Sequence, residues 1–235
     1  MKIWGYWATF GWAVLAFLVS QFVALGALVL WRPGALNLLL ETPYDGVLIT
    51  QFLLIANPVM IGVVALAVRL AHAGLRDYLA LELPPAHIVA TGLLGLVALI
   101  AASDVVLALS GQQLVTTFQS QSYQTALAAG WLPTMLIAAV IFASAGEEIL
   151  FRGFLFRGWA RSPRSVWPAI VAISLLWALM HVQYDWTGIV QIFVAGLFLG
   201  WMRWWSASTL LTFLLHALFN LEATMETVVQ ARFFS

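Results

Sequence analysis

Long apolar runs, each of about 20 residues, make up most of this 235-residue chain. The chain is 63% hydrophobic and 9% charged, whereas an ordinary soluble domain is about 25% charged. A helix of about 20 apolar residues is long enough to cross the hydrocarbon core of a bilayer. Because no water reaches that core, the backbone groups of a spanning segment must be satisfied within a helix. We therefore predict an all-α fold, a polytopic bundle of transmembrane helices.

Turn residues between the apolar runs define seven predicted spans. The proline-containing turns Arg32–Gly34 and Ser162–Pro163 end the first and fourth runs. The polar stretches 41–46 and 112–130 could each hold a further short span, which gives eight as the alternative count. With no internal repeat, we expect one integral membrane domain over residues 1–235. The predicted spans are Trp7–Leu30, Thr50–Ala71, Ile88–Leu109, Trp131–Phe156, Val166–His181, Thr187–Met202 and Trp204–Leu221.

Basic residues in the short connections predict the orientation, because cytoplasmic loops carry an excess of Lys and Arg. When the Arg157–Arg164 connection is placed in the cytoplasm, only Arg32 and Arg232 fall outside. We therefore expect a cytoplasmic N-terminus, in a multi-pass protein of a prokaryotic cytoplasmic membrane. The run Trp7–Trp31 is too long for a signal-peptide core and is expected to remain as an anchor. The basic residues predicted inside are Lys2, Arg69, Arg76, Arg157, Arg161, Arg164 and Arg203.

Composition also excludes several classes of function. The chain has no cysteine, which rules out disulfides, thiolate catalysis and cysteine-ligated zinc. Its formal net charge is zero, and no large basic cluster is present, so no nucleic acid partner is expected. The expected surroundings are membrane lipids.

Ionisable side chains inside three predicted spans need a compensating environment. A charged side chain at the centre of a bilayer costs about 2.5–3.5 kcal/mol, and such residues are usually functional. Counted from the cytoplasmic end of each span at about 1.5 Å per residue, Glu147, His181 and His216 lie roughly 15, 21 and 18 Å deep. In a core about 30 Å thick, these depths are similar. The three side chains could therefore share one hydrated cavity.

The spacing within the fourth span separates its two carboxylates. Glu148 and Arg152 are four residues apart on one helix face, so we predict an ion pair that neutralises both. Glu147 lies about 100° further around the helix and is predicted to be left free of any partner. A cluster of charges at a helix end is the structural alternative.

Two further pairs have the same four-residue spacing. Trp177 and His181 share one helix face, where we expect the indole to form an apolar wall beside the imidazole. His216 and Asn220 share one face of the last span in the same way. A free carboxylate, two imidazoles and an amide donor are the groups needed to activate water and to stabilise an oxyanion. The structural alternatives are a hydrogen-bonded core histidine and polar contacts between helices, which average about 0.6 kcal/mol in membranes.

These residues form three ordered motifs. Glu147 to Arg152 reads EExxxR, Trp177 to His181 is an aromatic residue followed by xxxH, and His216 to Asn220 reads HxxxN. Together they resemble the CPBP family of intramembrane proteases (CAAX prenyl protease and bacteriocin-processing, also called ABI). The resemblance covers residues 131–221, the predicted catalytic core. Trp177 replaces the phenylalanine common in the second motif, a change that bears on substrate fit.

The resemblance implies a role for each motif position. Glu147 is expected to activate the attacking water and His181 to position it, while His216 and Asn220 are expected to donate hydrogen bonds to the oxyanion. The second glutamate and the arginine of the first motif are expected to hold the helix and the cavity.

The chain is therefore predicted to be a peptidase, an intramembrane glutamic-type endopeptidase. Its expected partner is a peptide or protein substrate with a membrane-associated or lipidated segment. No cofactor is expected. A zinc ion held by the two histidines and Glu147 is the alternative, although the HExxH motif of many metalloproteases is absent. The alternative from another class is a non-catalytic membrane protein, a bacteriocin-immunity factor or an assembly scaffold, that binds a partner's tail with the same polar cluster.

Overall fold

The structure, a computed structural model, describes residues 3–233 apart from the side chain of Leu39 and is all-α over that range. Lys2, which the orientation argument includes, lies outside the described residues. Two π-helical segments, Ala138–Ala143 and Ile149–Leu155, and a short 3-10 helix, Pro163–Ser165, complete the helical content. The α-helices are α1 (Tyr6–Trp31), α2 (Ala35–Glu41), α3 (Gly46–Leu70), α4 (Leu75–Leu79), α5 (Ala86–Leu109), α6 (Thr117–Ala128), α7 (Leu132–Ile137), α8 (Ser144–Glu148), α9 (Phe156–Trp159), α10 (Val166–Leu179), α11 (Trp186–Ser206) and α12 (Thr209–Phe233).

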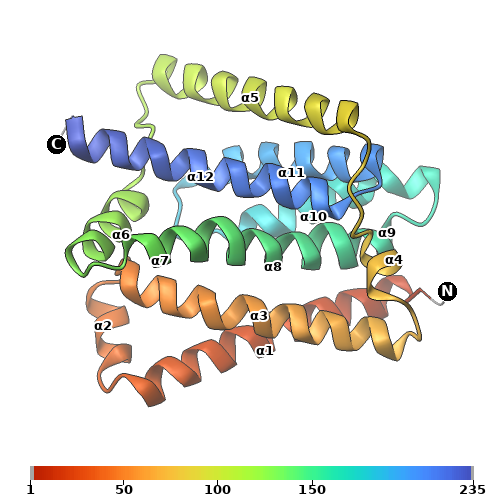
Figure 1. The fold of residues 1–235 in the computed structure, drawn as a ribbon, viewed down its shortest axis with the longest axis horizontal. Helices are drawn as coiled ribbons and strands as arrows, with labels where there is room; N and C mark the ends of the chain where they lie inside the picture. The colour runs from red at the N-terminus through yellow and green to blue at the C-terminus, as the bar shows by residue number, and fades with distance from the viewer. Residues whose placement is uncertain (1–2, 234–235) are drawn as a thin grey trace.

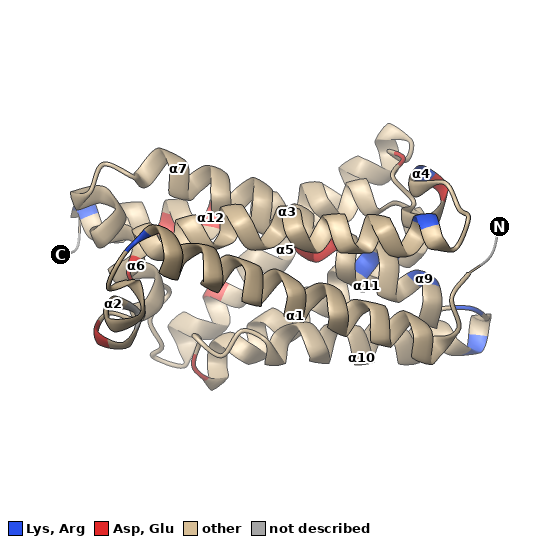
Figure 2. Cartoon of the chain, turned by 90° about the horizontal axis from the view of Figure 1, so that it is seen from below, with Lys and Arg blue, Asp and Glu red and all other residues tan. Residues whose placement is uncertain are grey.

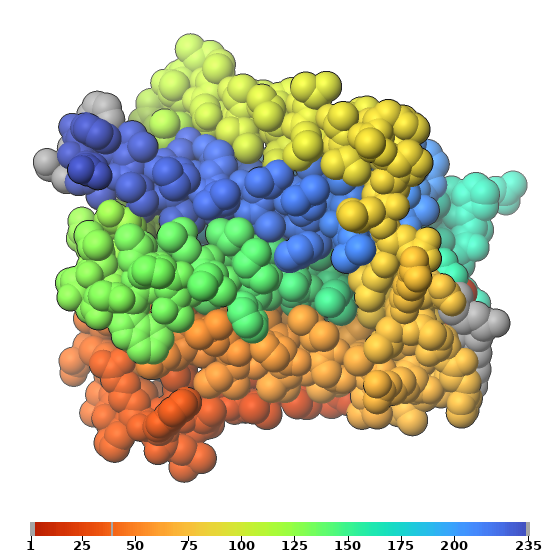
Figure 3. Space-filling view, viewed as in Figure 1, coloured from red at the N-terminus to blue at the C-terminus, as the bar shows by residue number. Residues whose placement is uncertain are grey.

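The long helices lie along one another in a bundle (Figure 1). Helices α7 to α9 and their two π-helical segments form one rod, Leu132–Trp159, through the middle of the bundle. The rod packs against α3 on one side and α12 on the other, α1 packs on α3, and α10 packs on α11. In the face shown in Figure 3 the rod lies between α3 and α12, and α5 covers the far side of α12. The rod is therefore placed where its side chains can meet those of α10 and α12.

Within residues 3–233, five helices are long and apolar enough to cross a membrane: α1, α3, α5, the rod and α11. The prediction of a multi-pass helical membrane protein is therefore confirmed by the length and composition of these helices. Helix α10 has only 14 residues, and α12 carries Glu222, Glu226 and Arg232. Seven or eight spans therefore stay a prediction.

Two predicted boundaries are wrong near the proposed site. The predicted seventh span began at Trp204, but α11 continues to Ser206 and α12 begins at Thr209. The break falls at Ala207, which has a left-handed φ of 53°, and the Ser208 hydroxyl accepts a hydrogen bond from the Leu211 amide at 3.0 Å. A serine that caps a helix in this way is a strong start signal, and it places the start of α12 beyond the interfacial Trp204.

The fifth predicted span also ran too far. It was expected to contain His181, but α10 ends at Leu179, and His181 lies in the turn that leads to α11. Asp185 ends this turn, because its carboxylate accepts a hydrogen bond from the Gly188 amide at 2.8 Å and caps α11. His181 is therefore held by a turn between two helices.

Charge is unevenly distributed along the bundle (Figure 2). Lys and Arg gather at the end that holds the N-terminus, α4 and α9, and few lie at the opposite end. Arg76 and Glu82 form an exposed ion pair at the basic end, with 3.0 Å between Nε and Oε1. The cytoplasmic N-terminus stays a prediction.

Candidate active site

The carboxylate pair lies on a short α-helical segment between two π-helical ones. Ser144–Glu148 is α-helical, and wider turns precede and follow it. A π-helical turn inserts an extra residue into the helical repeat, which changes the direction of the side chains beyond it, and such turns are common at functional sites. Sequence periodicity did not predict these turns. The rod therefore has an irregular geometry where it carries its two glutamates.

Glu148 lies at the centre of a fully buried ionic cluster. Its Oε1 atom accepts hydrogen bonds from Arg152 Nη1 at 2.9 Å and from His216 Nδ1 at 3.0 Å. All three side chains have 3% exposure or less. The predicted ion pair between Glu148 and Arg152 is confirmed. The contact with His216, 68 residues further along the chain, was not predicted, and it binds α12 to the rod.

Arg152 has two additional contacts that help to fix the cluster. Its Nη2 atom donates a hydrogen bond to the Gly196 carbonyl oxygen at 3.3 Å, and its guanidinium carbon lies 4.5 Å from the centre of the Trp177 ring. Such a cation–π contact is worth about 2 kcal/mol when both groups are desolvated. Arg152 therefore connects the rod to both α10 and α11.

Trp177 contacts every predicted catalytic residue except Asn220. Its indole N–H donates a hydrogen bond to Glu147 Oε2 at 2.5 Å. Its ring meets the rings of His181 and His216 edge to face, each at 5.2 Å between centroids. The predicted contact between the indole and His181 is confirmed, but the prediction that Glu147 has no partner is wrong. Trp177 has a polar N–H as well as an apolar ring, so it can pack against the histidines and also bind a carboxylate.

The hydrogen bonds of the two histidines indicate which ring nitrogen carries the proton in the neutral form. His181 Nδ1 lies 2.8 Å from the Trp177 carbonyl oxygen, and His216 Nδ1 faces the Glu148 carboxylate. Both partners can only accept, so we assign the proton of each neutral imidazole to Nδ1. Each Nε2 atom then carries a lone pair. His216 can donate from Nε2 only as an imidazolium, for which Glu148 provides the counter-charge.

Asn220 ties α12 to the rod through its side-chain amide. Its Nδ2 atom donates hydrogen bonds to the Ala139 carbonyl oxygen at 3.0 Å and to the Ser144 hydroxyl at 3.1 Å. Both amide hydrogens are therefore engaged. A direct role as an oxyanion donor would require one of these bonds to open, and this role stays a prediction.

One cavity of about 480 Å³ brings the predicted catalytic residues together. Glu147, His181, His216 and Asn220 all line it, as does Trp177. Glu148 and Arg152 do not appear in its lining, which agrees with their burial in the ionic cluster. The adjacent glutamates of the first motif therefore face different surroundings: Glu147 is half-buried at the cavity, and Glu148 is 0% exposed.

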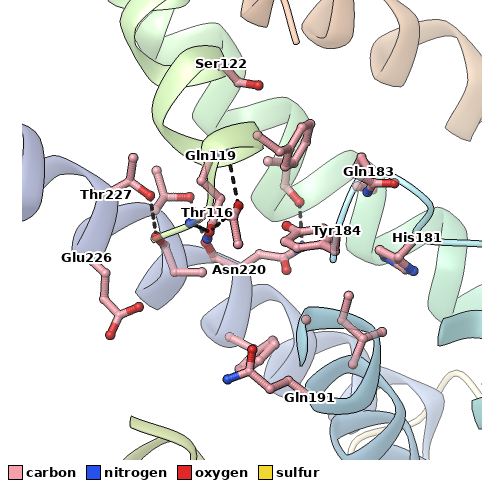
Figure 4. A pocket seen from close by; sticks show the side chains of 18 of the residues that line it. Thr116, Gln119, Ser122, His181, Gln183, Tyr184, Gln191, Asn220, Glu226 and Thr227 are labelled. Atoms are coloured by element: carbon pink, nitrogen blue, oxygen red, sulfur yellow. Dashed lines mark hydrogen bonds between the residues drawn. The ribbon is translucent and has the colours of Figure 1, made fainter. Parts of the chain in front are cut away.

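Further polar residues line the same cavity (Figure 4). Tyr184 lies in the turn after α10, with its ring 6.1 Å from that of His181. Asp104, Glu222 and Glu226 have carboxylate oxygens within 4.8 Å of one another. The four-residue spacing of the two glutamates could have indicated a shared face, but no sequence signal links them to Asp104 on α5. Tyr184 could have been noticed because it stands three residues after His181.

The donor types required for zinc are present, but they do not converge. Within residues 3–233, only the three-carboxylate cluster brings three ligand atoms within 4.8 Å of one another, and Glu147, His181 and His216 do not form such a group. A zinc ion between these three would require the side chains to move closer together.

Comparison with protein families matches residues 129–221 to the model of the type II CAAX prenyl endopeptidase Rce1-like family. Comparisons with curated proteins and with solved structures give no match. The matched range includes the rod from its first residue to its last, as well as α10, α11 and the part of α12 that carries His216 and Asn220. It agrees closely with the range 131–221 over which the three motifs resemble the CPBP family. Residues 129–221 of this multi-pass membrane protein therefore match a domain of the Rce1-like type II CAAX prenyl endopeptidase family.

Proposed function

We propose that the protein is an intramembrane endopeptidase in which Glu147 and His181 activate water for attack on a peptide bond. The observation that carries this proposal is the single cavity lined by Glu147, His181 and His216. The family match over residues 129–221 supports a protease. We further propose that Asn220 completes the site as a positioning residue, and that Glu148, Arg152 and Trp177 support it.

The hydrogen bonds of the site suit Glu147 to the role of general base. Trp177 occupies its Oε2 atom, which leaves Oε1 for the proton of a water molecule. The Nε2 lone pair of His181 can accept the second hydrogen of the same water. When the water oxygen attacks the carbonyl carbon, its proton passes to Glu147 and the carbonyl π electrons move to oxygen. When that intermediate collapses, the C–N bond breaks and the proton passes to the leaving amine. General base catalysis of this kind contributes about 10²- to 10⁴-fold.

His216 is suited to stabilise the oxyanion in its protonated form. Glu148 accepts from its Nδ1 atom, so the imidazolium would be paired with a buried carboxylate while Nε2–H points away from that carboxylate. Charge-assisted hydrogen bonds of this kind are about twice as strong as neutral ones. Loss of one oxyanion donor typically lowers kcat about 10²- to 10³-fold.

We propose that α10 and α12 also cross the membrane, which gives seven spans in one domain over residues 1–235. The gathering of basic residues at the N-terminal end of the bundle supports a cytoplasmic N-terminus. The host is proposed to be a prokaryotic cytoplasmic membrane. The substrate is proposed to be a peptide or protein with a membrane-associated segment, and the family name favours a prenylated C-terminus.

The test compares the wild type with Glu147→Gln in proteoliposomes, using a farnesylated fluorogenic peptide that ends in a CAAX sequence. We expect cleavage by the wild type and a loss of at least 10²-fold in the variant, with insertion unchanged. Mass spectrometry of host membrane proteins should show termini that disappear with the variant. Equal cleavage by both proteins would refute the proposal. A biological effect that survives Glu147→Gln would favour the non-catalytic immunity factor or scaffold.

A further inference from the structure

Tyr184 is held firmly in the turn between α10 and α11. Its backbone N–H donates a hydrogen bond to the His181 carbonyl oxygen at 3.0 Å. Its ring meets Phe118 of α6 edge to face, at 5.3 Å between centroids, and lies 6.1 Å from the ring of His181. Below it, a Cβ added at Gly188 would lie 2.9 Å from the Tyr184 Cβ atom. Any side chain larger than that of Gly188 would therefore collide with Tyr184.

The hydroxyl of Tyr184 is available as a donor. Among the described residues it makes no hydrogen bond, although the residue lines the cavity that contains Glu147. Burial, and then the negative charge of Glu147, raise the pKa of Tyr184 above its ordinary value. The phenol therefore keeps its proton near neutral pH. In the view of Figure 4, Tyr184 lies between the labelled Asn220 and His181.

Several other donors near the base already have partners, and Nε2 of His216 can donate only in the protonated form proposed above, so Tyr184 would act beside it. The Trp177 N–H binds Glu147, both amide hydrogens of Asn220 bind the rod, and His216 Nδ1 binds Glu148. An oxyanion is stabilised best by donors that are fixed before the reaction begins. Gln183 also lines the cavity, but no ring contact fixes it as Phe118 and His181 fix Tyr184.

We propose that the Tyr184 hydroxyl is a catalytic hydrogen-bond donor to the carbonyl oxygen of the scissile peptide bond. This inference rests on the proposed function. As water attacks the carbonyl carbon, negative charge develops on that oxygen, and the phenol O–H donates to it without transferring its proton. Such a bond is stronger in the transition state than with the bound substrate, so it acts mainly on kcat.

The experiment uses the full chain in proteoliposomes with the farnesylated fluorogenic peptide. Tyr184→Phe removes only the hydroxyl, and we expect kcat to fall at least tenfold, up to about 10³-fold, with KM within about threefold of wild type. A peptide aldehyde, whose hydrate resembles the tetrahedral intermediate, should lose affinity by a similar factor. Tyr44→Phe is the matched control, because Tyr44 also packs edge to face on Phe118, at 5.6 Å. It should keep kcat within about twofold.

The outcomes separate this inference from the function on which it rests. If the wild type cleaves no faster than Glu147→Gln, the proposed protease is refuted and the inference falls with it. If the wild type cleaves and Glu147→Gln does not, a wild-type kcat in Tyr184→Phe overturns the inference alone. An equal loss in Tyr44→Phe also overturns it. If Tyr184→Phe does not fold, Gly188→Ala replaces it. The added methyl group displaces the Tyr184 ring while the hydroxyl group is kept, so an unchanged kcat in Gly188→Ala would overturn the proposal.

Discussion

Replacing Glu148 by Gln is expected to destabilise the protein more than any other change of a single charged group. The substitution keeps the shape of the side chain but removes the negative charge that faces Arg152 and His216 at 2.9 and 3.0 Å. Arg152 is 1% exposed, so its charge would be left uncompensated away from water. Removing one partner of a buried ion pair costs about 3–5 kcal/mol. We expect the free energy of unfolding to fall by that amount.

The assay is unfolding by SDS titration in mixed micelles, followed by tryptophan fluorescence. An exposed ion pair in the same protein provides the control: Arg76 and Glu82 are separated by 3.0 Å, with side chains 74% and 60% exposed. Because surface pairs are typically worth about 0–1 kcal/mol, Glu82→Gln should change stability by no more than that. The matched bond lengths isolate the effect of burial.

The double variant Glu148→Gln with Arg152→Met tests the cause of the loss. It removes the unpaired charge as well as its partner, so it should be more stable than Glu148→Gln alone. The reasoning would be refuted if Glu148→Gln cost less than about 1 kcal/mol, or if the double variant lost the sum of the two single effects.

Three further predictions concern the rest of the site. Trp177→Phe keeps an aromatic ring beside the histidines but removes the N–H that donates a hydrogen bond to Glu147. We expect kcat to fall about 10- to 10²-fold, because the base loses its orientation. The thermal unfolding temperature should stay close to that of wild type. Gly146→Ala would place a Cβ 3.0 Å from the Asn57 Cβ atom and closer still to the amide oxygen of Asn57. The free energy of unfolding should therefore fall by about 1–3 kcal/mol. In the control Gly11→Ala, the added Cβ meets nothing within 4 Å, so the free energy of unfolding should not fall. EDTA should leave cleavage of the farnesylated peptide unchanged, and a loss restored by zinc alone would favour the metal alternative.

The local part of the site could be predicted from the sequence. Glu148 and Arg152 form their pair because four-residue spacing on a helix brings side chains together regardless of what surrounds the helix. The contact between Trp177 and His181 has the same origin. The membrane class also follows from local composition, since apolar runs of about 20 residues specify spanning helices.

Contacts between distant segments could not be predicted in this way. The bond from His216 to Glu148 and the two bonds from Asn220 to the rod depend on how α12 packs, which no spacing within α12 determines. A uniform period of 3.6 residues does not predict the two π-helical segments. The start of α12 does have a local signal, the capping Ser208, but the interfacial tryptophans before it give a competing signal for the boundary.

Under the proposed mechanism, the contrast between the two adjacent glutamates explains why the first motif has both. A single carboxylate bound to Arg152 and His216 would already have strong donors on one oxygen, so it would be a weak base and would have little access to substrate. Glu148 fills that position, neutralises Arg152 and holds His216 at the cavity. Glu147, about 100° further around the helix, is then left with only a neutral indole donor and an open side toward the cavity. Consecutive residues of a helix point about 100° apart, so one can face the core while the next faces the cavity wall. Glu148 can therefore stabilise the bundle in an ionic cluster while its neighbour Glu147 remains free to take a proton.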